Sequence, residues 1–279
     1  MKILVLGYKG MLGTDLMARL GGHSLTGKDV DDFDITSAAD CRDIIGENAP
    51  DIVINAAAFT DVDGCETREE TAFAVNASGV KNVALACREG NIRIIHFSTD
   101  YVFDGTGDRP YKEDDPCNPI NAYGRSKLQG ELYLKEFSKN YTLVRTSWLY
   151  GRHGKNFVKA ILQRAKNSQP LEVVTDQVGS PTYTPDLAGA VKVLAEGGHT
   201  GTFNVTNRGS CSWYEFARRI LDLSGFEDVA IKPITSDLLE RKAMRPKNSL
   251  LSGEKFAGAT GKTLRFWQIA LRDYLELPV

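Results

Sequence analysis

Cysteine and histidine are scarce in this sequence, and neither shows a spacing typical of a metal site. Five cysteines and four histidines occur in 279 residues. Widely separated cysteines without a Cys-x-x-Cys pair are typical of reduced packing thiols in the cytoplasm, not of a disulfide framework or a zinc site. We therefore expect a cytoplasmic location and no bound metal. The cysteines are Cys41, Cys65, Cys87, Cys117 and Cys211.

Long apolar runs and a strong net charge are also missing. The first apolar segment, Ile3-Leu-Val-Leu6, is closed by Gly7 and is too short for a signal peptide or a membrane span. A formal net charge of -2 argues against general affinity for nucleic acid or acidic membranes. Hydrophobic residues make up 42% of the chain and charged residues 25%, as in ordinary globular proteins. The length predicts one large domain or two interleaved ones.

Short apolar runs alternate with helical patterns through the first 150 residues. The runs at 3–6, 23–26, 50–55, 92–97 and 141–145 predict strands of a parallel sheet, several of them apolar enough to be buried on both faces. The helical patterns between them predict crossovers that cover both faces of the sheet. The predicted fold class is α/β, with a Rossmann-type doubly wound parallel sheet.

Glycines follow the first predicted strand at a spacing that suits a dinucleotide. Gly7, Gly10 and Gly13 form Gly-x-x-Gly-x-x-Gly, and a helical pattern begins at once. Such glycines allow a tight turn, close approach of a diphosphate to the backbone and close helix–strand packing, while the helix N-terminus attracts the anion. The spacing differs from the commoner Gly-x-Gly-x-x-Gly, and a plain glycine turn is the alternative interpretation. The position between strand and helix favours dinucleotide binding.

The residues after the second predicted strand leave the choice between NADH and NADPH open. A dinucleotide fold recognises the 2′-hydroxyl or 2′-phosphate of the adenosine ribose at this point. Asp29 suits NADH, whereas Lys28, together with Lys9 in the glycine loop, suits NADPH. Asp34 and Ile35 are expected near the adenine end.

Small and polar residues end the third and fourth predicted strands. Asn55-Ala-Ala-Ala58 leaves room for a ligand at the carboxyl edge of the sheet, where open α/β sheets bind their ligands. Ser98-Thr-Asp-Tyr101 brings hydroxyl groups to the same edge. A hydroxyl there can hydrogen-bond a substrate carbonyl.

Tyr123 and Lys127 are four residues apart at the start of a helical pattern, so they lie on one helix face. An isolated tyrosine has a pKa of about 10, and we expect the Lys127 ammonium to lower it. Alone, this spacing is more typical of a solvated helix face than of a catalytic pair. The glycine loop and the strand ends that precede it favour catalysis.

Capping patterns predict several helix starts. Thr67-Arg-Glu-Glu70 and Ser212-Trp-Tyr-Glu215 have the spacing of a capping box. In Thr184-Pro185 the threonine is expected to cap and the proline to occupy the first helical position. The first capping box predicts one long helix, in which Asn76 is either simply exposed or part of a proton path.

In this order and spacing, the motifs resemble those of extended short-chain dehydrogenases/reductases. Further stretches narrow the resemblance to the dTDP-4-dehydrorhamnose reductase family, and the likeness runs from Met1 to the last predicted helix. These stretches are residues 55–63, 97–105, 176–184 and 245–249 and the helix around Trp267.

The resemblance implies a reaction and its cofactor. Members of the family reduce the C4 ketone of dTDP-6-deoxy-L-lyxo-4-hexulose to dTDP-L-rhamnose with NADPH or NADH. The resemblance implies that Tyr123 donates the proton, that Lys127 hydrogen-bonds the nicotinamide ribose, and that Thr99 and Asp100 position the sugar. The implied cofactor-binding residues are Gly7, Gly10, Met11, Leu12, Gly13, Lys28, Asp29, Asp34, Ile35, Asn55, Ala56, Ala57, Ala58, Ser98, Tyr123 and Lys127. The implied substrate-binding residues are Thr99, Asp100, Tyr101, Trp148, Asn156 and Arg245.

The resemblance also implies two domains with different binding roles. We assign residues 1–150 to an NAD(P)-binding domain and 151–279 mainly to a smaller, interleaved C-terminal domain for the nucleotide sugar. Segments near 171–206 are expected to return to the first domain. The expected oligomeric state is a monomer or a homodimer. Trp148 as a core aromatic and Arg245 as a surface charge are the alternative interpretations of those residues.

Two other functions stay open at this point. A nucleotide-sugar 4-epimerase of the same superfamily would hold NAD tightly and recycle it. A non-catalytic regulatory subunit, resembling that of methionine adenosyltransferase, would have no physical need for Thr99, Tyr123 and Lys127. A dehydratase is disfavoured, because those relatives carry a glutamate where this sequence has Tyr101.

Overall fold

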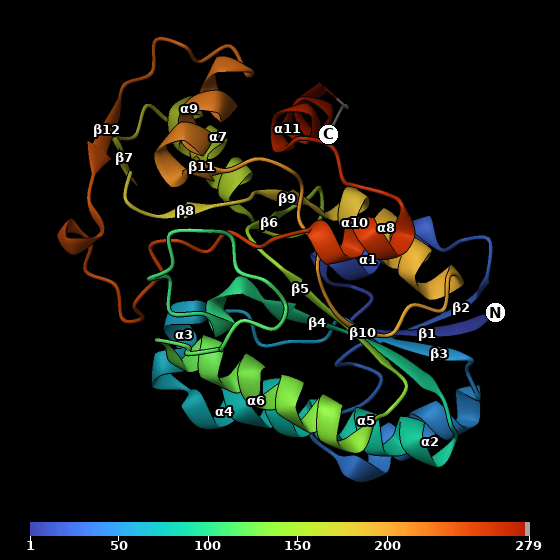
Figure 1. Ribbon diagram of the computed structural model, residues 1–279. Coiled ribbons are helices and arrows are strands. Elements are labelled where there is room, and N and C mark those ends of the chain that lie inside the picture. The colour runs from blue at the N-terminus through green and yellow to red at the C-terminus, as the bar shows by residue number, and fades with distance from the viewer. Residues whose placement is uncertain (277–279) are drawn as a thin grey trace.

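Six parallel strands form the central sheet of the computed structural model, which describes residues 1–276 (Figure 1). Their order across the sheet is β10-β5-β4-β3-β1-β2. The predicted α/β class with a doubly wound parallel sheet is confirmed. The strands are β1 (Lys2–Leu6), β2 (Ser24–Lys28), β3 (Ile52–Asn55), β4 (Arg93–Thr99), β5 (Tyr141–Thr146) and β10 (Gly201–Asn204).

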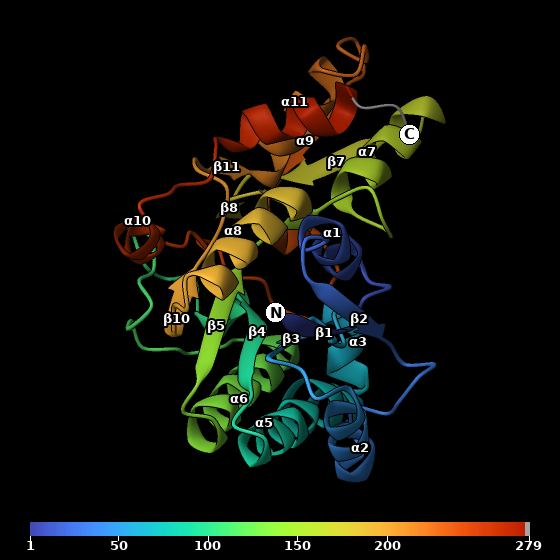
Figure 2. The same ribbon diagram turned by 90° about the vertical axis from the view of Figure 1, so that its right-hand side faces the viewer.

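Helices cover both faces of this sheet. Figure 2 shows α1 and α8 above the sheet and α2, α5 and α6 below it. Each face has its own apolar core, and β3 and β4 are buried along their whole lengths. The helices are α1 (Met11–Arg19), α8 (Thr184–Glu196), α2 (Ala38–Asn48), α5 (Gly79–Glu89) and α6 (Ala122–Phe137).

The later elements build a smaller part with its own core, which lies above α1 and α8 in Figure 2. Helices α7 (Phe157–Lys166), α9 (Trp213–Asp222) and α11 (Trp267–Glu276) contribute most of that core. Within residues 171–206, β10 joins the central sheet, whereas β7 (Leu171–Val174) pairs with β12 (Ile231–Ile234). The division into two domains near residue 150 stays a prediction. Two further strand pairs are β6 (Leu149–Tyr150) with β9 (Thr182–Tyr183), and β8 (Val178–Gly179) with β11 (Cys211–Ser212). Helix α10 (Glu254–Thr260) packs beside β10.

The sheet order places a ligand crevice at one edge. Strand β1 lies between β2 and β3, so the chain changes its winding direction between β1 and β3. Open α/β sheets bind ligands outside the carboxyl ends of their strands at such a point. The loops that follow β1, β3 and β4 therefore surround the expected site.

The long helix predicted from Thr67 is confirmed from Glu69 to Glu89, where the helical backbone continues through a π-helical turn, but the predicted capping box is wrong. The chain forms α3 (Val62–Thr67), α4 (Glu69–Phe73), a π-helical turn η1 (Ala74–Ser78) and then α5. Thr67 ends α3, and the side chain that caps this helix is Asp61. Asn76, in the π-helical turn, is fully buried: its amide donates to the Phe59 carbonyl at 3.0 Å and to Ser126 Oγ at 3.0 Å.

Two other capping predictions have different outcomes. The capping box of Ser212 and Glu215 is confirmed at the start of α9. Helix α8 begins at Thr184 itself, with Tyr183 as the flanking residue. The Thr184 hydroxyl donates to the Asp15 carboxylate of α1 and therefore joins two helices instead of capping one.

Membrane-spanning helices and metal clusters are not found in the part of the chain that the structure describes. No helix within residues 1–276 is long and apolar enough to cross a membrane. No group of three or more His, Cys, Asp or Glu residues in the same range has the arrangement of a metal site. All five cysteines are free thiols, and four of them are buried.

A buried ion pair between α6 and β5 gives a stability prediction. Arg145 donates to both carboxylate oxygens of Glu131, at 2.9 and 2.7 Å, and both side chains are at most 1% exposed. Arg145→Met leaves the Glu131 charge buried without its main partner, and we expect the free energy of unfolding to fall by about 3–5 kcal/mol. Urea unfolding measures this change. The double variant Arg145→Met with Glu131→Gln removes both charges and is expected to recover much of the loss; a double variant no more stable than the single one contradicts this interpretation.

Candidate active site

The glycine loop links β1 to α1 in a conformation that requires glycine. Gly7 has a φ of +79°, and a Cβ there would lie 2.7 Å from the Ala57 backbone nitrogen. A Cβ on Gly13 would lie 2.1 Å from the Gly7 carbonyl oxygen, so only glycine allows α1 to pack this closely. Helix α1 has no side-chain cap at Gly10, which leaves the N–H groups of its first turn available to an anion.

Two adjoining cavities lie along this loop. The central cavity, of about 460 Å³, is bounded by the glycine loop, the end of β3, the end of β4 and the start of α6. The glycine-loop cavity, of about 340 Å³, shares Gly10 and Ala56 to Ala58 with it and extends toward the end of β2. Of the predicted residues, the central cavity is lined by Gly10, Met11, Leu12, Gly13, Asn55, Ala56, Ala57, Ala58, Ser98, Thr99, Asp100, Tyr101, Tyr123, Lys127 and Trp148, and the glycine-loop cavity adds Gly7, Asp29, Asp34 and Ile35.

The residues that line these cavities fit a dinucleotide. The alanines after β3 leave the crevice unobstructed beside the free first turn of α1. Two buried groups on the cavity wall, Asn55 Nδ2 and Thr146 Oγ1, have no hydrogen-bond partner within residues 1–276. Buried polar groups normally find partners, so a ligand with several polar groups suits this wall.

Tyr123 is brought to the end of β4 by close packing of α6. Asn121 caps α6 by accepting from Gly124 N at 2.7 Å. A Cβ on Gly124 would lie 2.2 Å from the Tyr101 carbonyl oxygen, so this glycine lets the helix approach the turn after β4. The Tyr123 and Tyr101 rings meet edge to face, with centroids 5.8 Å apart.

The pKa of Tyr123 lies above its ordinary value in this structure, so the lowered pKa that we expected is wrong as a net direction. Burial, and next the charge of Asp100, raise the pKa of the phenol above its ordinary value, while a hydrogen bond with Thr99 opposes the shift. Lys127 is turned toward β4, where its ammonium donates to the Phe97 carbonyl at 2.7 Å. Tyr123 is therefore held in its protonated form, which is the form that can donate a proton.

Lys127 and Asp100 are both buried at the cavity wall, with exposed fractions of 2%. Burial lowers the pKa of Lys127 to about 8, against the smaller effect of Glu131, so the ammonium is the main form at neutral pH. Burial raises the pKa of Asp100 to about 7, against hydrogen bonds with Ser249 and Thr99. Two groups of opposite charge type thus titrate close to neutrality beside Tyr123.

Two tryptophans, Trp148 and Trp213, also line the central cavity. Trp148 has a φ of +48°, an uncommon conformation for a bulky residue, and its ring stacks on Trp213 with centroids 3.6 Å apart. A Cβ on Gly179 would lie 2.4 Å from the Trp148 ring, so that glycine makes room for the indole. Backbone strain of this kind is most common at functional sites.

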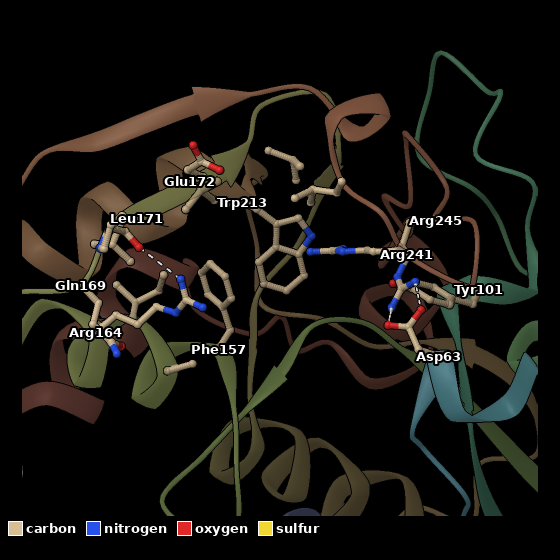
Figure 3. A pocket seen from close by; sticks show the side chains of 16 residues that line it. Asp63, Tyr101, Phe157, Arg164, Gln169, Leu171, Glu172, Trp213, Arg241 and Arg245 are labelled. Carbon is tan, nitrogen blue, oxygen red and sulfur yellow. Dashed lines mark hydrogen bonds and ion pairs between the residues drawn. The ribbon is translucent and has the colours of Figure 1, made fainter. Parts of the chain in front are cut away.

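A larger outer cavity, of about 880 Å³, adjoins the central one through Tyr101 and Trp213, which line both (Figure 3). Arg245 forms a two-pronged ion pair with Asp63, with both nitrogen–oxygen distances 2.7 Å. In Figure 3 the Arg241 guanidinium points toward the Trp213 ring. Burial, and next the charge of Arg245, lower the pKa of Arg241, as expected where positive charge accumulates.

Two predicted residues lie outside these three cavities. Asn156 caps α7: its side-chain oxygen accepts from Lys159 N at 3.0 Å, and its amide donates to the Gly151 carbonyl at 2.6 Å. Asn156 as a substrate contact stays a prediction, and its side chain is hydrogen-bonded to the backbone of its own loop. Lys28 ends β2, where its carbonyl accepts from Gly7 N at 2.8 Å.

Sequence reasoning missed Trp213, Phe157 and Arg241, which line the outer cavity. Trp213 is the first residue of α9, directly after the capping Ser212. The available signal was a large aromatic at a helix start together with two arginines four residues apart, Arg241 and Arg245, in a distant stretch of the chain. It was weak, because nothing local joins positions 213 and 241.

Comparison with known proteins finds relatives that match nearly the whole chain. Residues 1–278 match the family model described as RmlD substrate binding domain. The chain is 43% identical to the spore coat polysaccharide biosynthesis protein SpsK of Bacillus subtilis, covering 99% of this chain and 97% of that protein.

Two solved structures have nearly the same fold. A dTDP-4-dehydrorhamnose reductase from Clostridium acetobutylicum superposes with a TM-score of 0.95 at 41% identity, covering 99% of both chains. The dTDP-4-dehydrorhamnose reductase from Bacillus anthracis, solved in complex with NADP, has a TM-score of 0.95 at 35% identity over 98% of both chains. The chain therefore belongs to the RmlD family, the family of the dTDP-4-dehydrorhamnose reductases.

Proposed function

We propose that this protein uses NADPH or NADH to reduce the C4 ketone of dTDP-6-deoxy-L-lyxo-4-hexulose to dTDP-L-rhamnose. One observation carries the proposal: Thr99, Tyr123 and Lys127 line a single cavity that continues along the glycine loop. The similarity to dTDP-4-dehydrorhamnose reductases, one of them solved with NADP, supports both the reaction and the cofactor.

Tyr123 supplies the proton in the proposed reaction. The bound cofactor supplies a hydride to the C4 carbonyl, and the oxygen then needs a proton. Tyr123 is half-buried and protonated, with a hydrogen bond between its hydroxyl and Thr99. The same Thr99 hydroxyl donates to Asp100 at 3.0 Å, so these two residues form a fixed polar edge against which the sugar can be oriented.

Lys127 supplies a positive charge near the Tyr123 phenol. When Tyr123 gives up its proton, a partly buried phenolate is left on the same helix face, one turn from Lys127. Because burial disfavours the phenolate, a fixed cation at that distance lowers the free energy of the charged product state. We further propose that Lys127 donates to the cofactor ribose, as the family resemblance implies.

The outer cavity is suited to the nucleotide diphosphate. Trp213 and Phe157 offer aromatic faces for a base, and Arg241 and Arg245 offer positive charge for phosphate oxygens. Tyr101 lines both cavities, so a sugar at Tyr123 and a nucleotide at Trp213 occupy one continuous space. This assignment gives Arg245 its predicted place near the substrate.

Replacing Trp213 tests the nucleotide assignment. Stacking of a base on an aromatic side chain contributes about 1–3 kcal/mol, so Trp213→Ala is expected to raise the KM for the nucleotide sugar about 5- to 150-fold. The KM for the cofactor is expected to stay unchanged, and Trp213→Phe, which keeps an aromatic face, should show a smaller increase. Steady-state kinetics with thermal unfolding as a stability control measures these effects. An unchanged KM for the sugar in Trp213→Ala would remove the base from this cavity.

A cytoplasmic location is proposed from the thiols alone. Five free cysteines and no disulfide among the described residues suit a reducing compartment. A monomer or a homodimer stays the predicted assembly.

The identity of the product tests the proposed function. The protein is incubated with the 4-keto sugar and either NADPH or NADH, and the nucleotide sugar formed is identified by proton NMR. We expect dTDP-L-rhamnose and one equivalent of oxidised cofactor for each sugar. A sugar epimerised without net consumption of cofactor indicates a 4-epimerase, and cofactor binding without any change of the sugar indicates a binding subunit.

A further inference from the structure

A buried histidine lies directly against the ammonium of Lys127. His96 Nε2 is 3.4 Å from Lys127 Nζ, and the imidazole has an exposed fraction of 0%. His96 belongs to β4 and directly precedes Phe97, whose carbonyl accepts the shorter hydrogen bond from Lys127 at 2.7 Å. Two adjacent residues of one strand thus contact the same ammonium.

The chemistry of the two groups fixes the state of the histidine. An ammonium has three N–H donors and no acceptor, so a favourable contact requires a lone pair on Nε2. The imidazole must then be neutral, with its proton on Nδ1. Burial first, and the charge of Lys127 second, lower the pKa of His96 well below its ordinary value, against a smaller opposing effect of the Asn55 backbone.

The other charged and titratable groups around Lys127 do not accept a hydrogen bond from its ammonium in the way that His96 can. On α6, Tyr123 lies one turn before Lys127 and Glu131 one turn after it. The Glu131 carboxylate is held by Arg145 of β5, and no hydrogen bond from Lys127 Nζ to Glu131 is found among residues 1–276. The neutral acceptors that the ammonium contacts are therefore both on β4.

We infer that His96 is a positioning residue: with the Phe97 carbonyl it accepts two of the three Lys127 N–H groups, so that the third faces the central cavity and the cofactor ribose. This inference rests on the proposed function for its kinetic consequences, but its structural part concerns the protein without cofactor. A merely packed histidine would need no particular tautomer.

NMR of the cofactor-free protein tests the tautomer directly. Long-range proton–nitrogen correlation spectra of protein labelled with ¹⁵N-histidine report which ring nitrogen carries the proton. The chain has four histidines, and His96→Gln assigns the signal of His96. We expect His96 to stay neutral, with its proton on Nδ1, while the pH is lowered through the ordinary histidine range. A proton on Nε2, or an imidazolium near pH 6.5, overturns the inference.

A pair of variants tests the consequence for Lys127. His96→Met keeps the length of the side chain but removes the acceptor, whereas His96→Gln provides an amide oxygen near the position of Nε2. Loss of an acceptor disfavours the ammonium, so the pKa of Lys127 should fall in the methionine variant. We expect the alkaline limb of kcat/KM to move down by about one pH unit in His96→Met, with a higher KM for the cofactor, and to stay near the wild-type position in His96→Gln.

The outcomes separate this inference from the proposed function. Wild-type alkaline limbs in both variants, with activity retained, overturn the role of His96 and leave the reductase intact. A wild-type protein that reduces no sugar overturns the proposed function, and the tautomer measurement still decides the contact between His96 and Lys127. Thermal unfolding identifies a variant that fails only because it is unstable.

Discussion

Tyr123→Phe is expected to lose about 10²- to 10⁴-fold in kcat, the range that a positioned proton donor contributes. Phenylalanine keeps the ring and its edge-to-face contact with Tyr101 but removes the hydroxyl that Thr99 hydrogen-bonds. Burial already holds the phenol protonated, so no other change of charge accompanies the substitution. The affinity for NADPH or NADH should stay close to that of the wild type, because the proton donor acts on the sugar oxygen.

A second tyrosine provides a matched control for this variant. Tyr111 is buried outside the central cavity, and its hydroxyl donates to Asp104 at 2.9 Å. Tyr111→Phe makes the same chemical change and is expected to keep the wild-type kcat. Pre-steady-state and steady-state rates with equilibrium cofactor titration measure both variants. Wild-type turnover in Tyr123→Phe would remove Tyr123 from its proposed role.

Lys127→Met is expected to lower kcat about 10- to 10³-fold and also to weaken cofactor binding. The rate effect follows from charge: a nearby cation shifts the pKa of an acid by about 1–3 units, and the phenolate left on Tyr123 loses that stabilisation. The binding effect follows from the proposed hydrogen bond to the ribose. The combined loss distinguishes this variant from Tyr123→Phe, which should affect turnover alone.

Lys135 is the matched control for the loss of a cation from α6. It lies two turns further along the helix, 35% exposed, with its ammonium 3.4 Å from Glu131. Lys135→Met changes the charge near Glu131 without touching the cavity and should leave both kcat and cofactor affinity at wild-type values. Equal losses in the two variants would mean that Lys127 acts through helix stability, and unchanged kinetics in Lys127→Met would contradict its proposed role.

Motifs that work through local geometry were predicted well from the sequence. The glycine spacing, the small residues after β3 and the polar end of β4 all lie around one cavity. The capping box at Ser212 is equally local, because both of its hydrogen bonds join residues three positions apart. Such features depend on the backbone of a few neighbouring residues, and the sequence specifies those directly.

Features that depend on distant contacts were not predictable in the same way. The helix predicted from Thr67 contains a π-helical turn at Ala74–Ser78, where buried Asn76 is hydrogen-bonded to Phe59 and Ser126, and a Cβ on Gly130 would lie 2.2 Å from the Asn76 carbonyl oxygen. Nothing in residues 67–89 alone shows that α6 packs so closely there. Asn156 illustrates the same limit, because its helix-capping bonds are visible only once the backbone of its loop is placed.

Electrostatics of the site required the structure as well. The spacing of Tyr123 and Lys127 places both on one face of α6, but it does not show how deeply the phenol is buried or that β4 binds the ammonium. Burial, and next the charge of Asp100, reverse the expected direction of the pKa of Tyr123. A protonated phenol agrees with the proposed role of Tyr123 as the proton donor of a reductase acting on a ketone.

Transfer of deuterium from the cofactor to the sugar tests the proposed reaction most directly. NADPH deuterated on the transferable position of the nicotinamide is incubated with unmodified protein and the dTDP-linked 4-keto sugar, and the product is analysed by NMR and mass spectrometry. Direct reduction predicts deuterium bound to C4 of dTDP-L-rhamnose, one atom for each molecule formed. A product without deuterium at C4, or a sugar left unreduced while the cofactor is bound, would contradict the proposed reductase activity.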